Sequence, residues 1–92
     1  MKQADAESFA AEVLGWLAED HARIGAFLAF SGLAPGSLRA AAGDSAFLLA
    51  VLDFLMADEA LLLACCESLD VPATRPAAAR MALPGGAEVH WT

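Results

Sequence analysis

The chain has 92 residues, of which 59% are hydrophobic, and it carries a formal net charge of −7. At this length we expect one helical domain, residues 1–92, with residues 1–3 and 87–92 as candidate flexible ends. Twelve acidic residues against five basic ones repel a phosphate backbone, so nucleic acid is not expected as a partner. The longest charge-free run, residues 24–38, is shorter than a membrane span and contains Gly and Pro, so no membrane partner is expected either.

The sequence favours a cytoplasmic location. The start of the chain lacks the apolar run of a secretory signal, because Asp5 and Glu7 closely follow Lys2. The cysteines, Cys65 and Cys66, are adjacent, and on a helix their side chains diverge by about 100°, so they cannot form an ordinary disulfide. A chain without disulfides is typical of a reducing compartment.

Apolar residues recur at helical spacing between acidic ones along most of the chain. Ala and Leu are frequent, β-branched residues are scarce and Tyr is absent, which favours helix over strand. We therefore predict an all-α fold, a compact bundle of five or six short helices with an extended C-terminal tail.

The first predicted helix covers residues 3–19. Phe9 and Trp16 fall on the border between its polar and apolar stripes, where an aromatic side chain usually contacts a neighbouring helix and stays partly exposed. The polar stripe consists of Asp5, Ser8, Glu12, Gly15 and Glu19.

The second predicted helix covers residues 21–31. Asp20 is its expected N-cap, and Gly32 supplies the left-handed residue that ends it. Phe30 points away from the core face of this helix. That core face is formed by Ile24, Phe27, Leu28 and Ser31.

Two further helices are predicted in the middle of the chain. The shorter one covers residues 35–42 and has Pro35 in its first turn. The longer one, residues 45–57, begins after the N-cap Asp44 and is apolar almost all round, so we expect it at the centre of the domain. The large apolar residues that surround its one charge, Asp53, are Phe47, Leu48, Leu49, Val51, Leu52, Phe54, Leu55 and Met56.

The last part of the chain predicts two more helices and a tail. Residues 59–69 follow the N-cap Asp58, and Thr74 is the expected cap of a sixth helix that ends at Leu83. In the tail, residues 87–92, alternate apolar residues suit an extended segment docked on the bundle, with a frayed end as the alternative. The inner face of the fifth helix consists of Leu61, Leu62, Cys65 and Leu69, with Cys66 nearer its edge.

One stretch resembles a known family. From Phe27 to Leu62 the chain reads FLAFSGLAPGSLRAAAGDSAFLLAVLDFLMADEALL, in which GLAPGSLR and FLLAVLDFLMADEALL are the most specific pieces. The stretch is similar to an uncharacterised family of short all-helical bacterial proteins, catalogued as a domain of unknown function. The resemblance extends to the LPGG turn at residues 83–86. It implies a compact helical domain of the bacterial cytoplasm and supplies no activity, ligand or site residue.

The residues do not indicate an enzyme, a cofactor or a metal site. Glu19, Asp20 and His21 straddle a helix junction, where a polar cap is expected without any acid–base role. The histidines and cysteines lack the paired spacing that presents two ligands to one metal ion. We therefore expect no catalytic, cofactor-binding or metal-binding residues.

Residues 23–42 resemble a helix-turn-helix, because two short helices meet at Gly32 and Leu33. A DNA-binding regulator of this type is the alternative function. The second helix of the pair offers only Arg39 as a cation, and the chain is acidic, so the interpretation as two helices packed at a glycine turn is favoured.

Large apolar residues outside the core faces give the functional prediction. Leu63 is four residues from both Glu59 and Glu67, and Leu49 and Met56 flank a charge. A contiguous group of such residues marks an interface, whereas other helices and the tail would cover them in a monomer. The expected function is a small soluble interaction or regulatory protein with an unknown protein partner or a homodimeric state. The candidate interaction surface consists of Phe30, Leu49, Met56 and Leu63.

Overall fold

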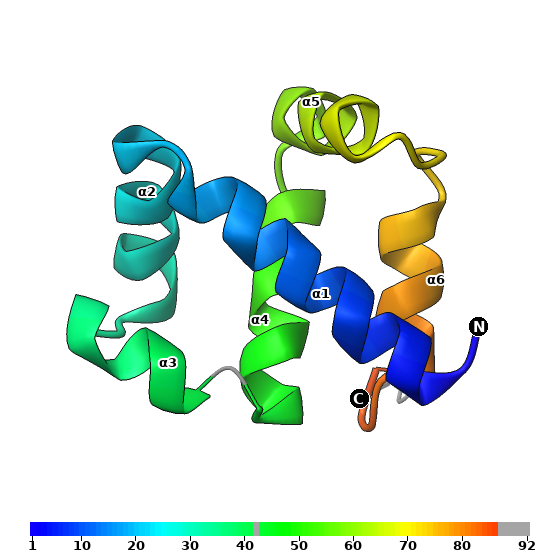
Figure 1. The fold of residues 1–92 in the computed structure, drawn as a ribbon, viewed down its shortest axis with the longest axis horizontal. Coiled ribbons are helices and arrows are strands. Elements are labelled where there is room, and N and C mark those ends of the chain that lie inside the picture. Colours follow the sequence, from blue (N-terminus) through cyan, green and yellow to red (C-terminus); the bar gives the residue numbers. More distant parts are fainter. Residues whose placement is uncertain (42, 87–92) are drawn as a thin grey trace, which may run out of the picture.

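The computed structural model describes residues 1–41, with only the main chain of Arg39, and residues 43–86. Within this part the chain is helical without a strand, so the predicted all-α fold is confirmed, and it is compact, with a radius of gyration of 12.4 Å (Figure 1). The predicted extended tail, residues 87–92, lies outside the described residues. The helices are α1 (Gln3–Ala18), α2 (His21–Ser31), α3 (Leu38–Ala41), α4 (Ser45–Met56), α5 (Glu59–Leu69) and α6 (Arg75–Ala82).

Helix α4 lies at the centre of the fold, as its sequence predicts. It packs against α1, α2, α5 and α6, and α1 crosses it in Figure 1. Because apolar side chains surround this helix, it is stable only when other helices cover several of its faces. Its buried residues are Phe47, Leu48, Val51, Leu52 and Leu55.

Helix α1 buries its apolar stripe, and its border aromatics differ from the prediction. Phe9 and Trp16 were expected to stay partly exposed, but only 3% and 4% of their surfaces remain accessible. Helices α2 and α6 both pack against α1 and cover its two edges. The guanidinium carbon of Arg23 lies 3.8 Å from the Trp16 ring centroid, a cation–π contact, and Arg23 also donates to the Trp16 carbonyl oxygen.

Aspartates begin three of the helices as predicted. The Asp20, Asp44 and Asp58 carboxylates accept hydrogen bonds from backbone N–H groups in the first turns of α2, α4 and α5. The bonds from the Arg23 and Ala22 N–H groups lower the pKa of Asp20, because they favour the charged carboxylate.

The start of α6 and the region of α3 depart from the sequence prediction. The Thr74 side chain makes no capping bond, because the residue already has helical dihedrals (φ −82°, ψ −12°) instead of the extended ones of an N-cap. The helix predicted over residues 35–42 is a 3₁₀ turn, Pro35–Ser37, followed by the single α-helical turn of α3. Among the described residues, none of the helices combines the length and apolar content that a membrane span requires.

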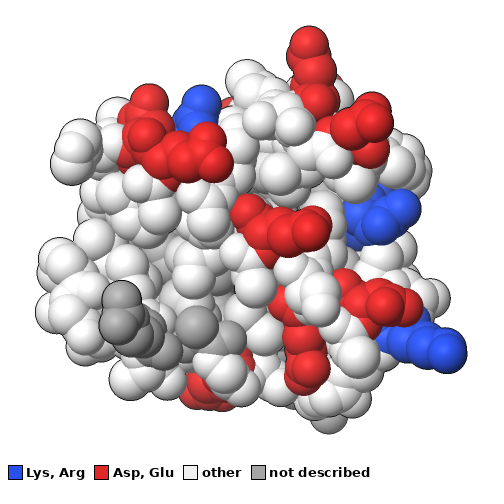
Figure 2. All heavy atoms as spheres, in the orientation of Figure 1, with Lys and Arg blue, Asp and Glu red and all other residues white. Residues whose placement is uncertain are grey.

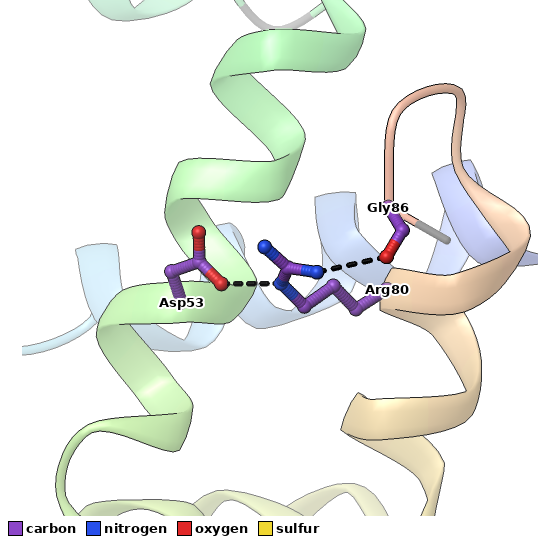
Figure 3. A network of polar contacts seen from close by, with 3 residues as sticks. All are labelled: Asp53, Arg80 and Gly86. Atoms are coloured by element: carbon purple, nitrogen blue, oxygen red, sulfur yellow. Dashed lines mark hydrogen bonds and ion pairs between the residues drawn. The ribbon is translucent and has the colours of Figure 1, made fainter. Parts of the chain in front are cut away.

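Arg80 joins α6 to α4 and to the turn after α6 (Figure 3). Its Nε donates a hydrogen bond to the Asp53 carboxylate, and its Nη1 donates one to the Gly86 carbonyl oxygen, with 2.9 Å between Nη1 and that oxygen. The bond to Asp53 raises the pKa of Arg80, because it stabilises the guanidinium cation. The one charge on α4 is therefore neutralised at the edge of the core.

The glycines of the turn at residues 83–86 are required by its geometry. Gly85 has a left-handed φ of +83°, which an L side chain disfavours. A Cβ on Gly86 would overlap the Arg80 carbonyl oxygen. The turn can therefore approach α6 only with glycine at position 86.

We predict that Leu52→Ala destabilises the protein by about 2–5 kcal/mol, because a fully buried side chain leaves a cavity. Leu63→Ala is the matched control, since Leu63 is 48% exposed and should change stability by about 0.5 kcal/mol or less. Chemical denaturation measures both. Equal effects would contradict the central position of α4.

We also predict that Gly86→Ala lowers stability by at least about 1 kcal/mol, because the turn must move away from Arg80. The control is Gly15→Ala on α1, where an added Cβ meets open space and should stabilise by about 0.4–1 kcal/mol. Thermal melts of the two variants should therefore shift in opposite directions. A Gly86→Ala protein as stable as wild type would refute the tight approach of this turn.

Candidate interaction surface

Of the four residues predicted to form an interaction surface, the structure places Phe30 apart from Leu49 and Met56. Phe30 is 53% exposed, Leu63 48% and Met56 38%, whereas Leu49 is partly buried and packs against the core. The C-terminal turn covers Leu49, whose Cδ1 would lie 3.6 Å from a Cβ on Gly85. The expectation that Leu49 lies outside the monomer core is therefore wrong.

Helix geometry explains this separation. Leu49, Asp53 and Met56 follow one another at four- and three-residue spacing, so they share the face of α4 that meets Arg80. Phe54 is two residues from Met56, about 200° around the helix, and lies on the opposite side. Phe30 packs against Phe54, with ring centroids 5.4 Å apart, so Phe30 and Met56 are on different sides of α4.

Phe30 is the outer member of an aromatic cluster between α2 and α4. The fully buried Phe27 packs edge-on against Phe47 at 5.7 Å and against Phe54 at 5.5 Å between ring centroids. Phe30 extends this row to the surface, where more than half of its side chain is exposed. One side of its ring is therefore held by the core and the other side is open to a ligand.

A groove of about 430 Å³ lies beside Phe30, between the end of α2, α3 and the first two turns of α4. Its side chains are mostly apolar, and its one carboxylate, Asp44, caps α4. We call it the Phe30 groove. Its lining residues are Phe30, Ser31, Leu33, Ala41, Asp44, Ala46, Phe47 and Ala50.

Sequence reasoning found Phe30 but missed the rest of this groove. Ala46 and Ala50 are one turn apart on α4, and such small residues leave space at a helix surface, which is the signal that the sequence carried. Leu33 belongs to the connection after α2, and its position depends on how α3 folds back. Met81, which is 66% exposed on α6, was also missed.

A second hollow, of about 480 Å³, lies between the first turns of α1 and the start of α6. Its lining is charged, and it combines two carboxylates with one guanidinium. Figure 2 shows acidic side chains spread over the face drawn, with few basic ones among them. The residues around the hollow are Met1, Asp5, Ser8, Phe9, Glu12 and Arg75.

The two cysteines are free thiols that are both shielded from solvent. Cys65 is fully buried in the core, and Cys66, expected nearer the edge of α5, is only 3% exposed. Burial raises the pKa of Cys65 to about 11 and also raises the pKa of Cys66, because it disfavours the thiolate. At neutral pH both thiols are therefore in their unreactive form.

The segment that resembles a helix-turn-helix lacks the length of a recognition helix. Helix α3 has four residues, about one turn, and such a helix is only about 6 Å long. A recognition helix lies along the major groove and contacts several base edges, which requires more than one turn.

Within residues 1–41 and 43–86, no three metal-ligating side chains of the His, Cys, Asp or Glu type come together.

Similarity to known proteins covers most of the chain. Residues 3–86 match the model of a family described as "Protein of unknown function (DUF3572)". This range includes the stretch from Phe27 to Leu62 and the turn at residues 83–86, where the sequence resemblance was found. No curated protein and no solved structure matches the chain.

We predict that Cys65 and Cys66 both react slowly with a thiol reagent in the native state and fast in denaturant. The pKa of Cys65 is about 11 in the folded protein, against about 8.5 for a free thiol. The unfolded state therefore loses this proton at lower pH, and the stability of the protein should fall as the pH rises from about 8.5 to about 11. Timed labelling followed by mass spectrometry measures the reactivity. Rapid native labelling of both thiols would contradict the inward position of this face of α5.

Proposed function

The chain belongs to this family of unknown function, and we propose that it acts as a non-catalytic interaction or regulatory protein of the bacterial cytoplasm that binds a partner protein in the Phe30 groove. The observation that carries the proposal is the exposure of Phe30, 53%, at the wall of an apolar groove. A large aromatic side chain that stays half exposed beside a concave apolar surface is typical of a binding site.

The groove fits a protein segment better than a small polar substrate. Its volume of about 430 Å³ is within the range of ligand pockets, but its side chains offer few polar groups to orient a reacting molecule. Phe30 is anchored on one side by Phe54, so it can present its free side with little loss of conformational entropy on binding. Such an anchored aromatic suits an apolar side chain from a helix or an extended segment.

Charge favours a basic partner over a second copy of the chain. Each copy has a net charge of −7, so two copies repel one another, whereas a segment with Lys or Arg beside its apolar anchor is attracted. Asp44 at the rim of the groove adds a local carboxylate for such a residue. The expected ligand is therefore an apolar segment flanked by basic residues.

The test is selection of binders from a random displayed-peptide library, followed by calorimetry with the selected synthetic peptides. We expect selected sequences to combine an aromatic or aliphatic anchor with Lys or Arg. Phe30→Ser should weaken their binding at least about tenfold, which corresponds to about 1.4 kcal/mol.

Leu63→Ser is the matched control, because it also removes a large apolar side chain of similar exposure, on the outer face of α5. It should leave peptide binding unchanged. Equal losses of peptide binding in both variants would overturn the proposal. A selection that yields no peptide binder of the wild-type protein would overturn it as well. Sedimentation velocity of the wild type over a range of concentrations tests the homodimer, and a dimer that Phe30→Ser dissociates would make the second copy the occupant.

A further inference from the structure

The turn after α6 brings the chain to the part of α4 next to the Phe30 groove. The Gly86 carbonyl oxygen binds the Arg80 guanidinium, which also binds Asp53 on α4 (Figure 3). Gly85 lies against Leu49, one turn earlier on the same helix. Gly86, the last described residue, therefore lies beside α4.

Two small side chains of α4 lie between the face that the turn covers and the groove. Ala50 follows Leu49 directly and is three residues before Asp53, and Ala46 is one turn earlier, so both lie next to the face that the turn covers. Both alanines also line the Phe30 groove. A chain leaving Gly86 can therefore cross α4 over a low surface and reach the groove.

The sequence after Gly86 has the pattern and the reach for this path. Residues 87–92 read AEVHWT, so Val89 and Trp91 share one side of an extended segment, and Glu88 and His90 the other. An extended chain advances at most about 3.3–3.6 Å per residue, so the five residues after Gly86 can span about 17 Å. A helix with its side chains is about 10–12 Å across. The segment from Gly86 to Trp91 is therefore long enough to reach the Phe30 groove.

We propose that residues 87–92 are an intramolecular ligand of the Phe30 groove, with Trp91 packed against Phe30 and Phe47. The groove supplies apolar contacts for the indole ring, and the Asp44 carboxylate at the rim can accept a hydrogen bond from its N–H group. The acidic side of the segment, with Glu88, faces solvent. The segment then competes with a partner for the groove, and this competition rests on the proposed function, whereas the docking itself does not.

The docking is tested in the full chain by amide NMR spectra of Trp91→Ala and of the matched control His90→Ala, which changes the opposite side of the segment. Trp91→Ala should shift the amide resonances of Phe30, Ala46 and Ala50, and His90→Ala should not. Shifts confined to residues 80–86, or shifts around Ser8 and Arg75 at the charged hollow, would overturn the docking.

A reciprocal variant changes the groove instead of the segment. Ala50→Glu places a carboxylate in the groove and should shift the indole N–H resonance of Trp91, whereas the exposed Ala11→Glu on α1 should leave it unchanged. The buried Trp16 gives an internal reference in the same spectrum. An indole resonance of Trp91 that ignores Ala50→Glu would overturn the assignment of its position.

The competition is tested with a peptide selected on the wild-type protein. A segment with about 100 µM intrinsic affinity, held at about 1 mM effective concentration, should weaken peptide binding about tenfold. Trp91→Ala should then strengthen peptide binding about tenfold and His90→Ala should not. Unchanged peptide binding in Trp91→Ala would overturn the competition, and the proposed function would still stand. If the NMR shifts show that the segment docks but no peptide binds, the segment is the occupant of the groove and the proposed function fails.

Discussion

The fold depends on covering α4. This helix is apolar almost all round, and a chain of 92 residues has little material with which to enclose it. Four helices pack around it, and each contributes its apolar face to one continuous core. Because a small domain buries a limited share of its surface, the enclosure is close to the minimum that the helix requires.

The one charge on α4 is accommodated where the enclosure ends. Asp53 lies at the edge of the core, and Arg80 neutralises it while holding the turn at Gly86. A partly exposed ion pair of this kind contributes modestly to stability, so its main consequence is geometric. It fixes where the chain leaves α6 and keeps Leu49 covered. The same contact thus closes one side of α4 and holds Gly86, the last described residue, on that side.

The Phe30 groove lies on the neighbouring face of α4, where Ala46, Phe47 and Ala50 line it. Within the described residues, the connection between α2 and α4 forms a 3₁₀ turn and one turn of α-helix, and the groove lies between this connection and Phe30. Protein interiors are densely packed and leave few spaces of this size beside an aromatic ring. At the surface, an apolar groove of this kind suits a ligand. An external apolar segment and residues 87–92 are the two proposed occupants of this groove.

The helices and several of their ends can be predicted from the residues alone, because they depend on local interactions. Asp20, Asp44 and Asp58 begin helices through bonds to their own first turns, and Gly32 ends α2 through its own dihedral angles. Thr74 failed as a cap because its backbone was already helical. Which border residues are buried depends on how the helices pack. Phe9, Trp16 and Leu49 are covered by other segments, whereas Phe30 stays exposed. A helical pattern defines the direction of a side chain, whereas its burial depends on which neighbour packs over it.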